Sequence, residues 1–104
     1  MKTNKNLTIV VFRKWRPNKD QDEGIIALFP YEIYNNTGLV NSYEHIGQHG
    51  GADYQHCILN TVPAKAYEYN ELKSILEGIG YDLEVIQRYS RKRYLHELYE
   101  AIKK

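Results

Sequence analysis

Residues 42–57 hold most of the side chains in this chain that commonly do chemistry. The stretch contains three of the four histidines, the only cysteine and three of the seven glycines. Imidazole binds metal ions and transfers protons near neutral pH, and glycine allows backbone turns that other residues rarely adopt. The stretch is therefore the first place where we expect a functional site.

A metal site here would use His45, His49 and His56, and zinc is the ion that such nitrogen ligands favour. The spacing of His45 and His49 places two side chains on one face of a helix. The glycines between and after them oppose a helix, and a zinc finger would need more cysteines. We therefore expect no metal or other cofactor and keep zinc as the alternative.

A catalytic site would use His45 or His49 as a general base, with Glu44 or Asp53 orienting the imidazole and Ser42 as the nucleophile. The chain has no nucleophile elbow, no glycine-rich phosphate loop and no HExxH motif. The sequence therefore favours a non-enzymatic protein and leaves enzymatic activity open. A metal-dependent hydrolase or nuclease using the loop histidines is the alternative function.

A third interpretation is a rigid turn that presents a surface to a partner. Aromatic rings and hydrogen-bonding groups on a glycine-shaped turn are typical of binding loops. The residues that would contact the partner are Tyr43, His45, Gln48, His49 and Tyr54. In the competing interpretation, the glycines shape the turn, and Gln48 and the histidines satisfy its backbone groups.

Two basic clusters suggest a second kind of partner. Arg13, Lys14, Arg16 and Lys19 surround Trp15 in the first cluster, residues 13–19. The second, residues 88–93, joins Arg88, Arg91, Lys92 and Arg93 to neighbouring tyrosines. Cations beside aromatic rings can hold phosphates and stack bases, so we predict Arg88, Arg91 and Arg93 as binding residues and nucleic-acid binding as an alternative function. The competing interpretation is a solvated helix face that pairs with nearby acids.

Composition limits the remaining classes of protein. The chain has 104 residues, so we expect one domain, residues 1–104. Its formal net charge of +1 gives no overall electrostatic attraction toward nucleic acid or membrane. One cysteine forms no disulfide within the chain, and no apolar run is long enough for a signal peptide or membrane span. We expect a protein of the bacterial cytoplasm that has no membrane partner.

The elements that would position these side chains follow from hydrophobic periodicity and turn residues. The pattern predicts strands at 7–12, 25–29, 39–45 and 54–59, with the first two paired as a hairpin and the glycines as a loop before the fourth. It predicts a helix over 66–78, where Lys65 stands in place of a capping residue. It then predicts a strand over 83–89. After the strand it predicts a last helix, which Ser90 caps and which buries an apolar stripe.

The predicted order is ββββαβα. An α+β fold follows, with a mainly antiparallel sheet of about five strands and two helices packed on it. Such a fold says little about function.

Several segments together resemble a family of small uncharacterised proteins encoded by phages and integrated bacterial mobile elements. The resemblance covers about residues 9 to 90, and its most specific part is the His-x-Gly-Gln-His-Gly core at 45–50. The other matching segments are Val11–Lys14, Ile26–Pro30, Ser42–Tyr54, Glu68–Tyr69 with Leu72, and Ile79–Tyr81 with Val85 and Arg88.

The resemblance implies a setting and no activity. It implies an intracellular accessory protein that binds a protein or a nucleic acid of the host or phage. We therefore expect a non-enzymatic, macromolecule-binding module that uses the glycine and histidine loop, residues 42–57.

Overall fold

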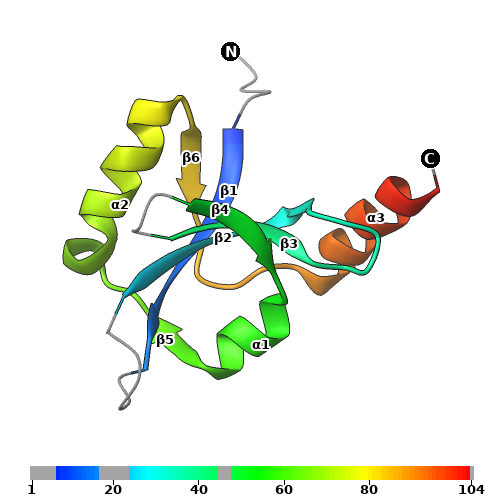
Figure 1. The fold of residues 1–104 in the computed structure, drawn as a ribbon, viewed down its shortest axis with the longest axis horizontal. Helices are drawn as coiled ribbons and strands as arrows, with labels where there is room; N and C mark the ends of the chain where they lie inside the picture. The colour runs from blue at the N-terminus through cyan, green and yellow to red at the C-terminus, as the bar shows by residue number, and fades with distance from the viewer. Residues whose placement is uncertain (1–6, 17–23, 45–47, 104) are drawn as a thin grey trace.

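The computed structural model describes residues 7–16, 24–44 and 48–103. The fold class is confirmed: helices and a mainly antiparallel sheet make an α+β protein (Figure 1). The strands are β1 (Leu7–Trp15), β2 (Ile25–Ile33), β3 (Val40–Glu44), β4 (Gln48–Ala52), β5 (Thr61–Pro63) and β6 (Asp82–Val85). The helices are α1 (Tyr54–Leu59), α2 (Ala66–Ile79) and α3 (Arg91–Ile102).

The sheet is centred on β1 and β2, which form the predicted antiparallel hairpin. Its order is β4-β3-β2-β1-β5, and every pair along this path is antiparallel. The outer edge of β1 is divided between two short strands. β6 runs parallel to its first half, from Leu7 to Val10, and β5 pairs with its last three residues.

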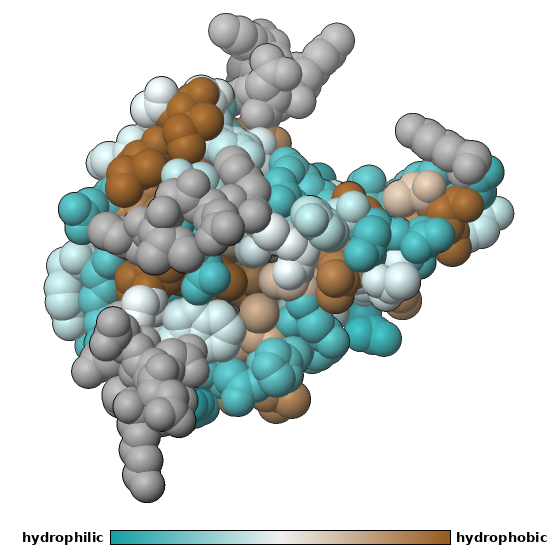
Figure 2. All heavy atoms as spheres, in the orientation of Figure 1, coloured by the Kyte–Doolittle hydropathy of each residue, from teal (hydrophilic) through white to brown (hydrophobic). Residues whose placement is uncertain are grey.

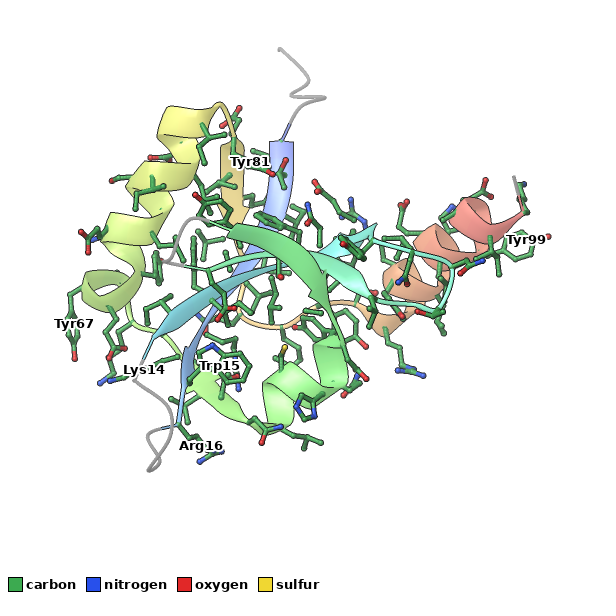
Figure 3. The ribbon with its side chains drawn as sticks, viewed as in Figure 1. Lys14, Trp15, Arg16, Tyr67, Tyr81 and Tyr99 are labelled. Carbon is green, nitrogen blue, oxygen red and sulfur yellow. The ribbon has the colours of Figure 1, made fainter. Side chains whose placement is uncertain are left out.

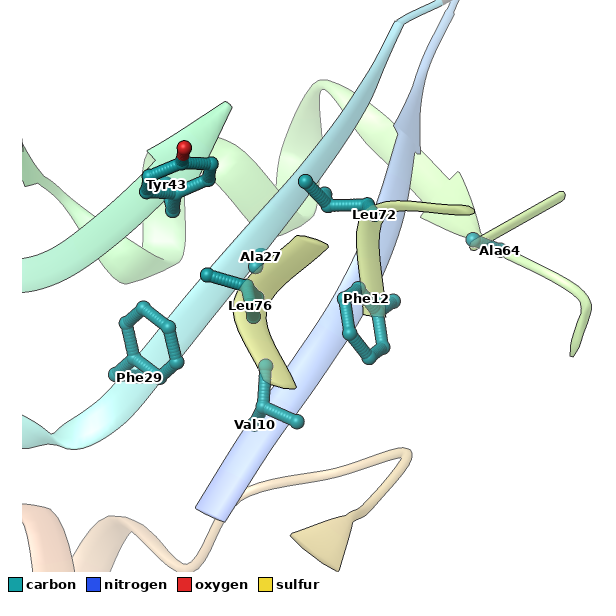
Figure 4. Packing of buried hydrophobic residues seen from close by; sticks show 8 residues of the cluster. All are labelled: Val10, Phe12, Ala27, Phe29, Tyr43, Ala64, Leu72 and Leu76. Atoms are coloured by element: carbon teal, nitrogen blue, oxygen red, sulfur yellow. The ribbon is translucent and has the colours of Figure 1, made fainter. Parts of the chain in front are cut away.

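Alternation along β1 sends its side chains to two different cores. Val10 and Phe12 face α2, whose Leu72 and Leu76 are at most 1% exposed (Figure 4). The Phe12 ring stacks on Tyr69 of the same helix with ring centres 4.4 Å apart. This core contains Val10, Phe12, Ala27, Phe29, Tyr43, Ala64, Leu72 and Leu76.

The opposite face of the sheet is covered by α1 and by the chain that leads into α3. Val11 belongs to this second core, with Tyr54 and Cys57 from α1 packed over it. The members of the second core are Val11, Ile26, Leu28, Val40, Ala52, Tyr54 and Cys57, with Tyr89 and Tyr94 packed at its border. Residues from the start of α1 and from residues 86–94 therefore meet on one side of the protein.

Helix α2 confirms the predicted helix over 66–78 and extends it by one residue. The missing Ser, Thr or Asp cap is replaced by Glu68, whose carboxylate accepts a hydrogen bond from the Lys65 backbone N–H at 2.9 Å. The same carboxylate accepts from Lys14 Nζ at 2.8 Å, which ties the helix to β1. The helix ends at Gly80, whose φ of 127° favours glycine.

Helix α3 confirms the predicted Ser90 cap, because the Ser90 hydroxyl accepts from the Arg93 N–H at 3.1 Å. The predicted buried stripe is wrong: no residue of α3 is buried, and Tyr99 and Ile102 are at least half exposed. The helix extends away from the sheet, so apolar side chains remain on its surface (Figures 1 and 2). One attachment to the rest of the fold is Tyr94, which donates from its hydroxyl to the Gly38 carbonyl at 2.6 Å.

The predicted strand over 54–59 is also wrong, since these residues form α1. Asp53 begins the helix by accepting from the His56 backbone N–H, and the buried residues Tyr54 and Cys57 lie three positions apart, which is a helical spacing. The fourth strand comes earlier, at Gln48–Ala52, where the sequence predicts a loop. A Cβ at Gly51 would overlap the Tyr34 ring, so glycine suits this edge strand.

The predicted strand over 83–89 is shorter than expected and ends at Val85. Ile86 still donates its backbone N–H to the Val10 carbonyl at 2.9 Å, and the chain then crosses toward α3. In the described part of the chain, no helix is long and apolar enough to cross a membrane.

Candidate functional site

The histidine stretch is divided between a hairpin and a helix. His45 lies outside the described residues, and so do the side chains of Gln48 and His49 on β4. His56 is exposed on α1, where the Asn60 amide nitrogen lies 3.4 Å from its ring nitrogens. Among the residues that the structure describes, no group of three His, Cys, Asp or Glu side chains is placed to hold a metal. The zinc site of His45, His49 and His56 therefore stays a prediction.

The two tyrosines predicted to face a partner lie on opposite sides of the sheet, and each is 6% exposed. Tyr43 packs in the core beneath α2, so its ring is not offered to a partner. The Tyr54 ring lies 4.0 Å from the Tyr89 ring, centre to centre, and lines two surface pockets. Burial raises the pKa of Tyr54 to about 12, so its hydroxyl stays protonated at neutral pH.

A pocket of about 430 Å³ lies between α1 and strands β2, β3 and β4; we call it the Glu44 pocket. The Glu44 carboxylate accepts from the Trp15 indole Nε1 at 3.1 Å. The Ser42 hydroxyl donates to the Gly50 carbonyl at 2.8 Å, so its proton is directed at the backbone and not at a base. The lining residues are Trp15, Ile26, Ser42, Glu44, Gly50, Gly51, Ala52, Asp53, His56 and Cys57.

Cys57 in the Glu44 pocket is 4% exposed and belongs to the second core. Burial, with a smaller contribution from the Asp53 and Glu44 charges, raises the pKa of its thiol to about 11. Because the thiolate is the nucleophile, this environment suppresses nucleophilic chemistry by Cys57 at neutral pH.

We expect native Cys57 to react with iodoacetamide at pH 8 about 100-fold more slowly than an unperturbed thiol, since a rise of the pKa from 9.0 to about 11 lowers the thiolate fraction by that factor. Mass spectrometry of samples quenched over time measures the rate. The matched control is the protein unfolded in urea, which should react at the unperturbed rate. Equal rates in the native and unfolded protein would contradict the burial argument.

A second pocket, of about 350 Å³, lies beside α1 and contains a buried arginine; we call it the arginine pocket. Arg13 is only 9% exposed. Its Nε donates to Thr61 Oγ1 at 2.8 Å, and its Nη2 donates to the carbonyls of Thr61 at 2.9 Å and Ile58 at 3.2 Å. Burial lowers the pKa of Arg13 from its ordinary value, yet an arginine remains charged in proteins.

The charge of Arg13 has no acidic partner: within the described residues it makes no ion pair, and no Asp or Glu lines the pocket. Arg88, from the second basic cluster, lines the same pocket. The full lining is Arg13, Tyr54, Gln55, Ile58, Pro63, Gln87, Arg88 and Tyr89. A buried cation without a counter-ion is costly, so a pocket with two arginines and no acid is suited to an anion.

A neighbouring groove of about 290 Å³ runs from α1 to the start of α3; we call it the tyrosine groove. The Gln55 Nε2 donates to the Tyr89 hydroxyl at 2.8 Å, and both side chains line the arginine pocket on one side and the tyrosine groove on the other. The groove is lined by Asp53, Tyr54, Gln55, Tyr89, Arg91, Tyr94, Leu95 and Leu98. We call the pocket and groove together the arginine–tyrosine surface.

The side chains of each basic cluster do not lie together in the structure. Lys14 lies on the α2 side of the sheet and pairs with Glu68, whereas Trp15 lies on the α1 side (Figure 3). The Arg93 guanidinium lies 4.2 Å from the centre of the Tyr31 ring, which fixes this predicted binding residue against the fold. Lys19 lies outside the described residues. The structure brings together Arg13 and Arg88 in the pocket and Arg91 in the adjoining groove.

Sequence reasoning did not identify Gln55, Gln87 or the buried position of Arg13 as parts of a site. The signal for Arg13 was available, because alternation along β1 puts it on the same face as Val11. No comparable signal exists for Gln55, which the sequence places in a strand and the structure in α1.

No family model matches the chain, and neither the curated proteins nor the solved structures that were searched contain a match.

Proposed function

We propose that this protein is a non-enzymatic binding module and that its ligand is a single-stranded nucleic acid, bound along the arginine–tyrosine surface. The observation that carries the proposal is the arginine pocket, which Arg13 and Arg88 line from distant parts of the chain and which has no Asp or Glu among its described lining residues. The phage and mobile-element resemblance of the sequence supports an intracellular accessory role for the module.

The cations of the arginine–tyrosine surface suit a phosphate backbone. Arg88 and Arg91 are exposed, and neither is held by an ion pair within the described residues. Arginine recognises phosphate through paired N–H donors and remains charged at any physiological pH. With a formal net charge of only +1, attraction for a polyanion depends on this local group.

The tyrosines explain why the proposed strand is single. The ring centres of Tyr54 and Tyr89 lie 4.0 Å apart, and those of Tyr89 and Tyr94 lie 5.8 Å apart. The rings of Tyr89 and Tyr94 are partly exposed at the groove beside the cations, whereas the Tyr54 ring, 6% exposed, supports Tyr89 from the second core. Aromatic side chains next to a basic track bind unpaired bases by stacking, which a duplex does not allow.

An enzyme is less well supported by the side chains in the Glu44 pocket. Ser42 donates to a backbone carbonyl, and the raised pKa of Cys57 keeps its thiol protonated. Neither residue is paired with a general base within the described residues, and that pairing is what nucleophilic catalysis needs.

Fluorescence anisotropy with labelled DNA and RNA single strands of about 12 nucleotides tests the proposed function. We expect affinity to fall with added salt, and each of Arg88→Ala and Arg91→Ala to lower the slope of log affinity against log salt by about 0.7. Each substitution should also weaken binding about fivefold at 0.1 M salt.

Lys73→Ala is the matched control, because Lys73 carries the same charge but lies on α2 and pairs with Glu77. This variant should bind as the unchanged protein does. Affinity indifferent to salt, no binding at low salt, or an equal loss in the Lys73 variant would each refute the proposal.

A further inference from the structure

We propose that the arginine pocket receives the terminal phosphate of the bound strand, so that the protein prefers phosphorylated ends to internal phosphodiesters. This inference rests on the proposed function and specifies which part of the nucleic acid enters the pocket. It follows from the unused donors of Arg13, from the small volume of the pocket and from its charge.

Arg13 has donor groups left over for a ligand. An arginine carries five N–H donors, and the bonds to Thr61 and Ile58 use the Nε and Nη2 groups. Nη1 meets no acceptor among the described residues. Every fully buried side-chain nitrogen or oxygen in the described part of the chain has a partner, so Nη1 must be reached by solvent. Because Arg13 lines the arginine pocket, a ligand bound there would be placed to accept from this group.

The bonds to Thr61 and Ile58 also hold the guanidinium in one orientation. Thr61 is 1% exposed, and its own hydroxyl donates to the Cys57 carbonyl at 2.6 Å, so the residue that holds Arg13 is itself fixed. A donor held rigid before binding loses little conformational freedom when the anion arrives.

The small size of the pocket favours a chain end. Helix α1 forms one side, and residues 87–89 face it. Gln55 and Tyr89, joined by a hydrogen bond, line both the pocket and the tyrosine groove. The pocket volume of about 350 Å³ is near the lower limit of small-ligand sites. An internal phosphodiester carries a sugar on both sides and needs more room, whereas a terminal phosphate carries a sugar on one side only.

The charge of the pocket agrees with a terminal phosphate. A phosphomonoester carries between one and two negative charges at neutral pH, because its second pKa is about 6. A phosphodiester carries one charge. The pocket offers the two cations Arg13 and Arg88 and, among its lining residues, no Asp or Glu that would oppose the second negative charge.

The test compares three strands of one sequence that carry a 5′ phosphate, a 3′ phosphate or hydroxyls at both ends. We expect one phosphorylated strand to bind about tenfold more tightly than the hydroxyl-ended strand. Inorganic phosphate should compete with that strand and reduce its affinity to the level of the hydroxyl-ended one. The 5′ and 3′ arms identify which end enters the pocket.

Arg88→Ala and Arg13→Lys should abolish the preference for the phosphorylated end. Arg91→Ala is the matched control, since Arg91 lines the groove and not the pocket; it should weaken all three strands equally and keep the preference. The Arg88 variant decides the question if the Arg13 variant fails to fold, because Arg88 is exposed.

The result separates this inference from the proposed function. Equal affinity for the three strands, or a preference that survives Arg88→Ala, would overturn the terminal-phosphate site and leave strand binding intact. Failure of all three strands to bind would overturn both proposals.

Discussion

Leu76→Ala is expected to lower the free energy of unfolding by about 2–5 kcal/mol. The Leu76 side chain is 0% exposed and, with Leu72, is one of only two buried residues of α2. It packs against the sheet among Val10, Phe12 and Phe29 (Figure 4). Alanine would lose this apolar contact and leave a cavity that the strands beneath cannot close without moving.

Ile79→Ala is the matched control, because it removes a branched aliphatic side chain from the same helix at a position that is 53% exposed. It should change the free energy of unfolding by no more than about 0.5 kcal/mol. Urea unfolding followed by circular dichroism measures both variants. If the two substitutions cost the same, α2 is not held to the sheet through the face described above.

Helix α2 could be predicted from the sequence because its apolar residues recur with helical spacing over fourteen residues. Helix α1 has six residues, and in a segment so short the pattern of a helix resembles that of a strand. The residue that could have indicated a helix here is Asp53, whose side chain caps α1. Aspartate is equally common in turns, so its presence alone did not distinguish the two.

The glycines of β4 misled the prediction for a different reason. Gly50 and Gly51 are poor strand formers by intrinsic preference, yet here they form an edge strand paired with β3. Tyr34 covers Gly51, and its ring occupies the space that a side chain at position 51 would need. This compensation comes from the residue that follows β2 and is not visible in the local sequence.

The candidate surface was only partly accessible to sequence reasoning because a cluster along the chain is not a cluster in space. Arg13 and Lys14 are neighbours in the sequence, but alternation along β1 sends them to opposite faces of the sheet. Arg13 instead lines the same pocket as Arg88. This arrangement depends on the turn of the chain after β6, which the predicted strand over 83–89 did not contain.

Tyr89→Ala is expected to weaken the binding of single-stranded nucleic acid by about 5- to 150-fold, which corresponds to about 1–3 kcal/mol for one aromatic ring that stacks on a base. Tyr89 borders both the arginine pocket and the tyrosine groove, and its ring packs between those of Tyr54 and Tyr94. Loss of the Tyr89 ring would remove part of the lining of both the pocket and the groove. It would also remove the middle ring of the three tyrosines.

Tyr89→Phe separates the ring from its hydroxyl. This variant keeps the aromatic face and loses the hydrogen bond from Gln55. We therefore expect its affinity to stay within about threefold of the unchanged protein, since a neutral exposed hydrogen bond contributes little. Anisotropy with the same labelled strands measures both variants, and their thermal unfolding curves show whether either substitution changes the fold.

Tyr99→Ala provides the control for a general effect of removing a tyrosine. Tyr99 is 60% exposed near the outer end of α3 and lines neither the arginine pocket nor the tyrosine groove (Figure 3). Its loss should leave affinity unchanged. If Tyr89→Ala binds no more weakly than Tyr99→Ala while remaining folded, the tyrosine row only packs α3 against the sheet, and the bases of a bound strand lie elsewhere.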